Sequence, residues 1–170
     1  MPQWPWRGPS RLGEFDVAVS AAEIGTPASV CELKWCTRDG VDALDEVMWD
    51  VLKLAHAQHI LPNVRAAYLV YAAPAKAWGT PTSRFRELFA GCDIETRAWL
   101  AEYLGVWRWC VRTSSKSRPL AAPRRIRTRR VGGAYVPSGP VEMQVQIAAV
   151  QGLWDEPTAL DDNAEPIGTL

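Results

Sequence analysis

Alternation of apolar and polar residues predicts two strands near the N-terminus. Residues 14–20 (EFDVAVS) alternate, and residues 28–36 (ASVCELKWC) alternate again after a Gly-Thr-Pro break. Because only a short connection separates them, we expect an antiparallel hairpin. In the second strand Val30, Glu32 and Lys34 would share one face, because successive side chains of a strand point to opposite sides.

A helical pattern follows, and then a buried strand. From residue 41 onward apolar residues recur three and four positions apart, with acidic residues in the first turns, where the helix dipole favours them. Residues 65–73 (RAAYLVYAA) are almost entirely apolar, as expected of a strand with neighbours on both sides. The predicted order is therefore strand, strand, helix, strand.

The second half of the chain continues the α/β pattern. Residues 83–90 and 94–104 have helical spacing, and residues 106–113 alternate as a strand would. Residues 124–136 and 141–150 also alternate, and Pro-Ser-Gly-Pro separates them. We therefore expect a C-terminal β-hairpin.

Length and composition are those of one globular domain. The chain has 170 residues, 48% of them hydrophobic and 22% charged, enough for a single hydrophobic core. We expect one domain over residues 1–154 and an acidic, flexible tail over residues 155–170. No apolar run reaches the ~18 residues of a membrane span, and the N-terminus has no secretory signal. A cytoplasmic protein without membrane contact is expected.

Charge is distributed unevenly although the formal net charge is zero. Residues 105–130 contain nine basic and no acidic residues, whereas residues 155–170 contain five acidic and no basic residues. Such separation favours an anionic partner for the basic segment. The alternative is that the acidic tail screens the basic segment.

Two carboxylates and a lysine carry the candidate chemistry. Glu32 and Lys34 lie two positions apart on one strand, and the neighbouring strand can bring Asp16 beside them. Paired carboxylates bind a hard cation such as Mg²⁺ or Mn²⁺, which polarises a phosphoryl oxygen and lowers the pKa of a bound water. Lys34 would orient that water or stabilise the developing charge. These groups suit phosphodiester hydrolysis, although Glu32 and Lys34 could also form a simple surface ion pair.

Asp16, followed sixteen residues later by Glu32-Leu33-Lys34 and then by a helix and an apolar strand, resembles the PD-(D/E)xK nuclease superfamily. The resemblance covers residues 14–73. It implies a restriction-endonuclease-like fold, in which helices flank a mixed central sheet. The C-terminal hairpin would be an addition to that fold.

The resemblance also implies roles for individual residues. Asp16 and Glu32 would be metal ligands, the Leu33 backbone carbonyl a further ligand, and Lys34 the catalytic lysine. Glu14 shares a face with Asp16 and is another candidate ligand.

Two departures from the family pattern are visible. Phe15, and not a proline, precedes Asp16. Only irregular residues precede the first predicted strand, where the family usually has a helix that often supplies another acid. These departures leave open a protein that keeps the fold without its catalysis.

Basic residues supply a candidate nucleic-acid surface. Arg125, Arg127 and Arg129 would share one strand face, and such a row can contact several phosphates. The alternative is a solvated edge strand that discourages aggregation. The complete set of candidate nucleic-acid contacts is Lys53, Arg124, Arg125, Arg127, Arg129 and Arg130.

Three functions remain open at this point. The first is a Mg²⁺- or Mn²⁺-dependent nuclease that hydrolyses phosphodiester bonds, with DNA as the expected substrate. The second is a catalytically inactive binding or accessory protein of the same fold, for example in a bacterial defence or conflict system. The third is an unrelated α/β protein in which the acidic tail and basic strand mediate contact with a protein partner or a homodimer.

Overall fold

The computed structural model places two strands and a long helix in the first third of the chain. Strand β1 (Val17–Ser20) pairs antiparallel with β2 (Pro27–Trp35), as the sequence predicts. Helix α1 (Val41–Ile60) follows and leads to β3 (Ala66–Pro74), which lies parallel to β2. The described residues are 15–20, 27–35, 41–61, 63–78, 84–98, 120–138, 141–155 and 158–160.

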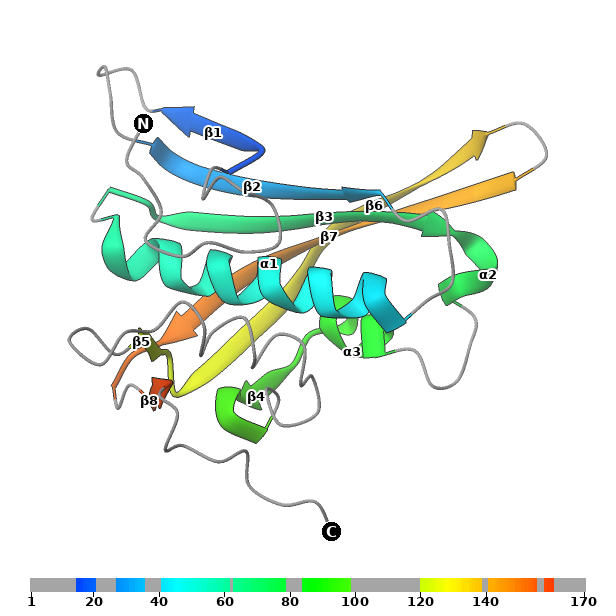
Figure 1. The fold of residues 1–170 in the computed structure, drawn as a ribbon. Helices are drawn as coiled ribbons and strands as arrows, with labels where there is room; N and C mark the ends of the chain where they lie inside the picture. The colour runs from blue at the N-terminus through cyan, green and yellow to red at the C-terminus, as the bar shows by residue number, and fades with distance from the viewer. Residues whose placement is uncertain are drawn as a thin grey trace, which may run out of the picture.

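Two long strands complete the sheet. The predicted C-terminal hairpin is present as β6 (Arg125–Ser138) and β7 (Val141–Leu153). It is not an addition to the central sheet, because β7 pairs along β3 and occupies the middle. Within the described residues the sheet has six strands in the order β1-β2-β3-β7-β6-β4 and is mixed, with one parallel pair (Figure 1).

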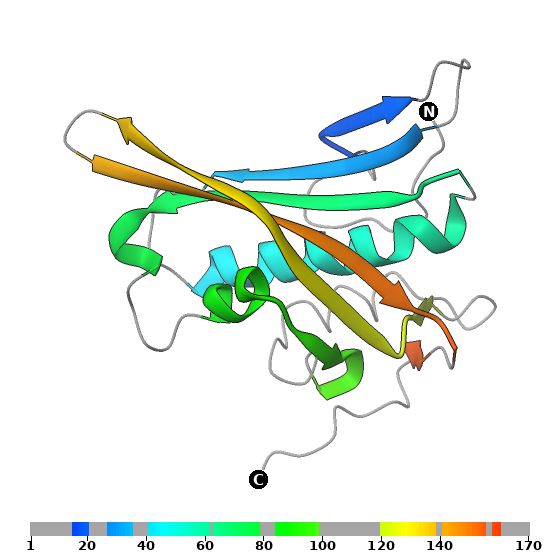
Figure 2. The same ribbon diagram turned by 180° about the vertical axis from the view of Figure 1, so that it is seen from behind.

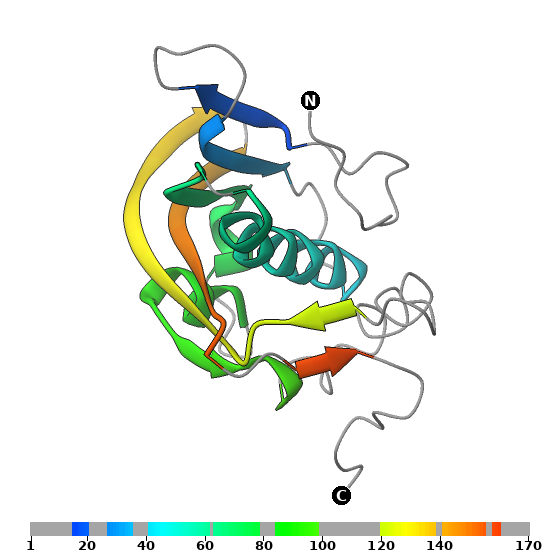
Figure 3. The same ribbon diagram turned by 90° about the vertical axis from the view of Figure 1, so that its left-hand side faces the viewer.

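One face of the sheet is covered by helices. The sheet curves around α1 (Figure 3), and residues 51–57 of that helix are all buried. Two short helices, α2 (Ala75–Trp78) and α3 (Arg84–Ala90), cover the same face near the hairpin, whose long strands twist together when seen from behind (Figure 2). The core lies between α1 and the sheet, where Leu54 and Leu69 are fully buried.

The opposite face of the sheet carries several exposed apolar side chains. Leu33 is 49% exposed and Trp35 is 59% exposed. Alternation along β2 explains this, because these two residues point away from α1 while Glu32 and Lys34 point toward it. The orientation of β2 therefore determines which charged side chains are buried.

One prediction of secondary structure needs correction. Residues 94–104 were expected to be helical, but β4 (Asp93–Glu95) forms an edge strand against β6, and only residues 96–98 within the described part are helical. Pairing with a long neighbouring strand overrides the local helical preference. Residues 106–113, predicted as a strand, lie outside the described residues.

The C-terminal segment is not wholly without regular structure. Strand β8 (Thr158–Leu160) pairs antiparallel with β5 (Leu120–Ala122) in a separate small sheet. Apolar residues within the acidic segment make this pairing possible. Among the helices of the described residues, none combines the length and hydropathy needed to cross a bilayer.

Candidate active site

Glu32 and Lys34 of β2 lie under helix α1. Both side chains point to the helix side of the sheet, where Glu32 is only 4% exposed and Lys34 is half-buried. Within the described residues the Glu32 carboxylate and the Lys34 ammonium form no ion pair with each other, because Glu32 faces Lys53 while Lys34 faces Glu46 and Asp50. The interpretation as a surface pair therefore does not describe them.

Helix α1 supplies the partners of these two side chains. Lys34 Nζ lies 3.1 Å from Glu46 Oε2 and 3.3 Å from Asp50 Oδ2. Lys53 Nζ lies 2.5 Å from Glu32 Oε1. The three helix residues are spaced four and three positions apart, which places them on one face of α1.

Asp16 lies directly before β1, at the open edge of the same group. Extending the pairing of Val17 with Cys31 by one residue sets Asp16 opposite Glu32. The backbone N–H of Leu33 donates a hydrogen bond of 2.7 Å to Asp16 Oδ2. The structure thus brings Asp16, Glu32 and Lys34 together, as predicted. Together with Glu46, Asp50 and Lys53 they are called the charged cluster below.

Burial shifts the protonation of the carboxylates in this cluster. Desolvation raises the pKa of Glu32 from 4.5 to about 8, although the nearby Lys53 ammonium lowers it, and the charges of Asp50 and Asp16 raise it further. Desolvation also raises the pKa of Asp50 against the lowering effect of Lys34. For both carboxylates, the cost of desolvating the charged form exceeds the stabilisation that the neighbouring ammonium groups provide.

The pKa of Lys34, one of the two lysines of the cluster, is shifted in the direction that keeps the side chain charged. Desolvation opposes ionisation of Lys34, but the carboxylates of Asp50 and Glu46 outweigh it, so its pKa is raised. Lys34 is therefore protonated at neutral pH. Its ammonium group is a fixed positive charge at the border between the cluster and solvent.

The charged cluster contains more acids than bases. Four carboxylates, those of Asp16, Glu32, Glu46 and Asp50, face two ammonium groups, which leaves two negative charges when all are ionised. Glu32 Oε1 is buried, and Lys53 Nζ is its partner among the described residues. Within those residues, no three acidic, histidine or cysteine side chains converge closely enough to bind one metal ion together.

Comparison with family models, curated proteins and solved structures finds no match. The function must therefore be inferred from the side chains themselves.

Three further predicted residues near the cluster have different positions. The side chain of Leu33 points away from the cluster, while its backbone binds Asp16. Lys53 is 4% exposed and lies 4.9 Å from the centre of the Phe15 ring, so it belongs to the cluster and not to a surface that nucleic acid can reach. Glu14 lies outside the described residues.

The predicted arginines lie on β6 or beside it, away from the cluster. Arg125 and Arg127 are exposed on the face opposite α1, and each lies 2.8 Å from a carboxylate oxygen of Asp93. Arg124 Nη1 lies 3.9 Å from Asp155. Arg129 shares the outer face, and Arg130 lies on the helix side, where it lines a cavity.

Two members of the cluster, Glu46 and Asp50, were not selected from the sequence. Glu46 was interpreted only through the helix dipole, and from the segment of residues 49–54 only Lys53 was selected. Their spacing contained the missing signal, because residues 46, 50 and 53 are charged along one face of a helix whose other faces are apolar.

Proposed function

We propose that the chain is a metal-dependent phosphodiesterase of the PD-(D/E)xK type, with a restriction-endonuclease-like fold, that cleaves nucleic acid and has DNA as its expected substrate. The observation that supports this proposal is the charged cluster. Asp16 and Glu32 come from two neighbouring strands, and Lys34 shares the strand face of Glu32. That arrangement is the one the resemblance implies.

The donor set fits a divalent cation. Asp16 and Glu32 would hold Mg²⁺ or Mn²⁺, with the Leu33 carbonyl as a further candidate ligand, because hard cations prefer oxygen ligands. The excess of two carboxylates over the ammonium groups of the charged cluster supports this assignment. When bound, the ion supplies a Lewis acid and a more acidic water.

The remaining side chains hold charge in fixed positions. Lys34 is kept protonated by Asp50 and Glu46, so it can stabilise the negative charge that develops on a phosphoryl group. Lys53 favours the ionised form of Glu32. The Leu33 N–H holds the Asp16 carboxylate beside the cluster.

Cleavage assays with Mg²⁺ and with Mn²⁺ test the proposal. Single- and double-stranded DNA and RNA would be incubated with the wild-type chain, with Asp16→Asn and with Glu32→Gln. Glu142→Gln removes an exposed carboxylate far from the cluster in the sheet and is the matched control. We expect cleavage by the wild type and the control only. The proposal fails if the wild type cuts no substrate, or if Asp16→Asn cuts at the wild-type rate.

A second candidate is a nuclease-fold binding or accessory protein without catalysis. The observation that favours it is that Glu32 already has an ammonium partner in Lys53, at the position where a metal would bind. Titration calorimetry with Mn²⁺ separates the two candidates. Binding that disappears in Asp16→Asn supports the enzyme, whereas the absence of such binding supports the accessory protein.

A further inference from the structure

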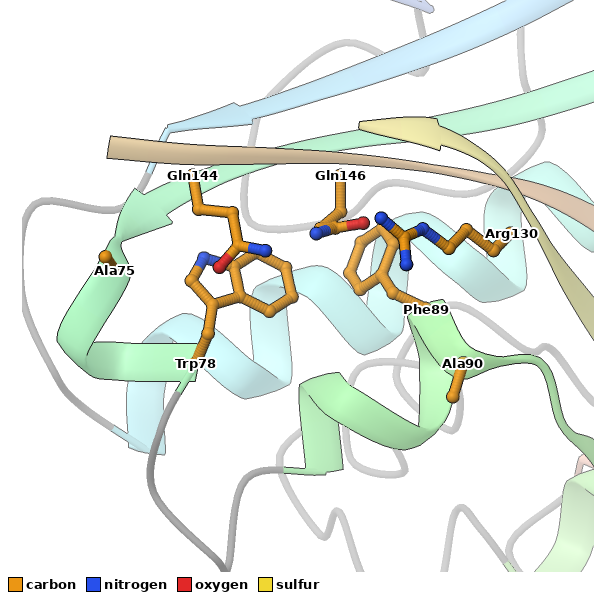
Figure 4. A pocket seen from close by; sticks show the side chains of 7 residues that line it. All are labelled: Ala75, Trp78, Phe89, Ala90, Arg130, Gln144 and Gln146. Atoms are coloured by element: carbon orange, nitrogen blue, oxygen red, sulfur yellow. The ribbon is translucent and has the colours of Figure 1, made fainter. Parts of the chain in front are cut away.

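A cavity of about 400 Å³ lies on the helix side of the sheet, away from the charged cluster. Its walls come from four elements, because α2 and α3 form one side while β6 and β7 form the other (Figure 4). Pockets for small ligands have volumes of about 300–1,000 Å³. The lining residues are Ala75, Trp78, Phe89, Ala90, Arg130, Gln144 and Gln146.

The inner wall of this cavity contains two buried polar atoms without a partner among the described residues. Trp78 Nε1 is a donor and Gln146 Oε1 is an acceptor, and neither forms a hydrogen bond. Both residues are more than nine-tenths buried, with 8% of Trp78 and 6% of Gln146 exposed. Buried polar groups are nearly always satisfied in folded proteins, so a ligand with an adjacent acceptor and donor would complete this wall.

The position of Gln146 depends on the strand beside it. Gly133 is its cross-strand partner, and a Cβ atom there would lie 2.9 Å from Gln146 Oε1. That separation is too short for carbon and oxygen, so glycine leaves room for the amide. The aromatic wall is also fixed, because Trp78 contacts Tyr71 and Phe89 edge to face at 5.4 and 5.2 Å between ring centres.

Positive charge is present at the mouth. Arg130 is exposed, its guanidinium group points into the cavity, and it forms no ion pair with a described residue (Figure 4). It differs in this from Arg125 and Arg127, which are held by Asp93. A guanidinium group can bind a phosphate or stack on a planar ring. Gln144 adds a half-buried amide beside it.

We propose that this cavity binds one nucleotide, with the base edge against Trp78 and Gln146 and the phosphate on Arg130. A nucleobase presents neighbouring donors and acceptors along its edge. A phosphate supplies an anion for Arg130, which forms no ion pair with a described residue. Among the described residues that line the cavity, Arg130 is the charged one.

The cavity is aligned with the charged cluster across the sheet. Lys34, Tyr71 and Gln146 are successive cross-strand partners on β2, β3 and β7. Strands lie about 4.8 Å apart, so Gln146 is about 10 Å from Lys34. The fully buried Tyr71 lies between the two sites. The cavity is therefore a second site beside the cluster, and its part in the cleavage of nucleic acid rests on the proposed function.

Binding in the presence of EDTA tests the cavity without any cleavage. Calorimetry would use the four deoxynucleoside 5′-monophosphates, the corresponding nucleosides and a short single-stranded oligonucleotide. Arg130→Gln is compared with Arg65→Gln, which removes the same charge from an exposed arginine that neither lines the cavity nor belongs to the candidate nucleic-acid contacts. We expect at least one probe to bind, and Arg130→Gln to weaken it about tenfold or more while Arg65→Gln changes it less than twofold.

The outcomes separate the sources of the nucleotide. Tight binding of a monophosphate identifies a free nucleotide as a sufficient ligand, whereas binding of the oligonucleotide alone identifies a nucleotide within a strand. Trp78→Phe keeps an aromatic ring and removes the donor, so it should weaken the same probe, with circular dichroism as the check on folding. The proposal is overturned if no probe binds, or if the two arginine variants weaken binding equally.

These results are independent of catalysis. If the protein cleaves no substrate and yet binds a nucleotide through Arg130, the assignment of the cavity stands and the assignment as an enzyme fails. A chain that cleaves DNA and binds probes unchanged in Arg130→Gln retains the enzymatic assignment and loses the cavity.

Discussion

Two strands of the sheet, β2 and β6, carry charged residues at alternate positions. The charged side chains lie on the helix-covered face in β2 and on the open face in β6. Glu32 and Lys34 of β2, the inner row, lie under α1. Arg125, Arg127 and Arg129 of β6, the outer row, lie on the face opposite α1 and are exposed. In the sequence the two patterns look alike.

A comparison of Asp93 with Glu32 shows how coverage by a helix changes the pKa of a carboxylate that has a cationic neighbour. Asp93 accepts a hydrogen bond from Arg127 and lies beside Arg125, and these contacts lower its pKa. Glu32 also contacts a cation, Lys53, but desolvation outweighs that contact and raises its pKa to about 8. Ion pairing thus decides protonation at the surface, while burial decides it under α1.

The largest effect expected from this difference is on stability. Lys53→Met leaves Glu32 buried without its cation and should lower the free energy of unfolding by about 3–5 kcal/mol at pH 8.5. Arg127→Met in the outer row should cost less than about 1 kcal/mol. Urea unfolding of both variants measures the contrast.

A second substitution checks the cause of that loss. Glu32→Leu added to Lys53→Met removes the unpaired carboxylate, so it should recover most of the lost stability. Equal costs for Lys53→Met and Arg127→Met, or no recovery in the double variant, would show that burial of the pair is not what distinguishes the inner row.

The next effect concerns cleavage. Lys34→Gln removes the ammonium group of the inner row and should lower kcat about 10²–10³-fold, as expected for one preorganised charge at a developing negative charge. Arg129→Gln removes an outer-row charge and should leave kcat unchanged. Single-turnover assays with Mn²⁺ measure both. An equal fall in the two variants would mean that Lys34 acts only through the overall charge of the protein.

Much of the fold follows from the sequence, for identifiable reasons. The order strand, strand, helix, strand was predicted because the periodicity is strong over residues 14–73, and the C-terminal hairpin was predicted from alternation on both sides of a proline-glycine turn. The pairing of β7 with β3 was not predicted. Alternation shows that a segment is a strand, but not which strand lies beside it.

The candidate site was predicted to a similar extent. Period-2 alternation set Glu32 and Lys34 on one face, and the hairpin brought Asp16 to them. Which side chains of α1 face β2 depends on how the helix is rotated against the sheet. Asp50 therefore entered the cluster only through the structure.

A smaller effect is expected on the pH dependence of stability. The raised pKa of Glu32 means that the folded chain holds a proton which the unfolded chain releases above pH 4.5. Stability should therefore fall as pH rises toward about 8, by at most ~1.4 kcal/mol per pH unit for one proton. His56, whose pKa is lowered from 6.5 to about 3, contributes a rise in stability that ends about one pH unit above its unfolded value. Measurement in the upper part of the range, just below pH 8, therefore isolates the fall due to Glu32.

Two comparisons sharpen the interpretation of that fall. Glu32→Gln should flatten the curve in this range, apart from a contribution of the same sign from Asp50. Asp93, whose pKa is lowered, contributes stability that is present above its unfolded value near 3.8, so Asp93→Asn should leave the slope unchanged. Saturating Mn²⁺ should also flatten the wild-type curve, because a bound cation keeps Glu32 ionised. A wild-type curve that is flat or rises would contradict the assignment to Glu32.

The smallest effect on stability is expected when Asp93, the acid that pairs with two arginines of the outer row, is replaced. Asp93→Asn removes the carboxylate that binds Arg125 and Arg127, and at an exposed site, where solvent screens the ion pairs, this should change stability very little. The two freed guanidinium groups should raise the affinity for DNA at low salt. The plot of log K for DNA binding against log salt concentration should steepen by about 1–2, since each phosphate contact contributes about 0.9 to its slope.

Glu142→Gln is the control, because that exposed carboxylate accepts a hydrogen bond from Tyr135. If the two variants bind DNA alike across a salt series, the outer row is a solvated strand face, and recognition of nucleic acid has to come from the helix side of the sheet.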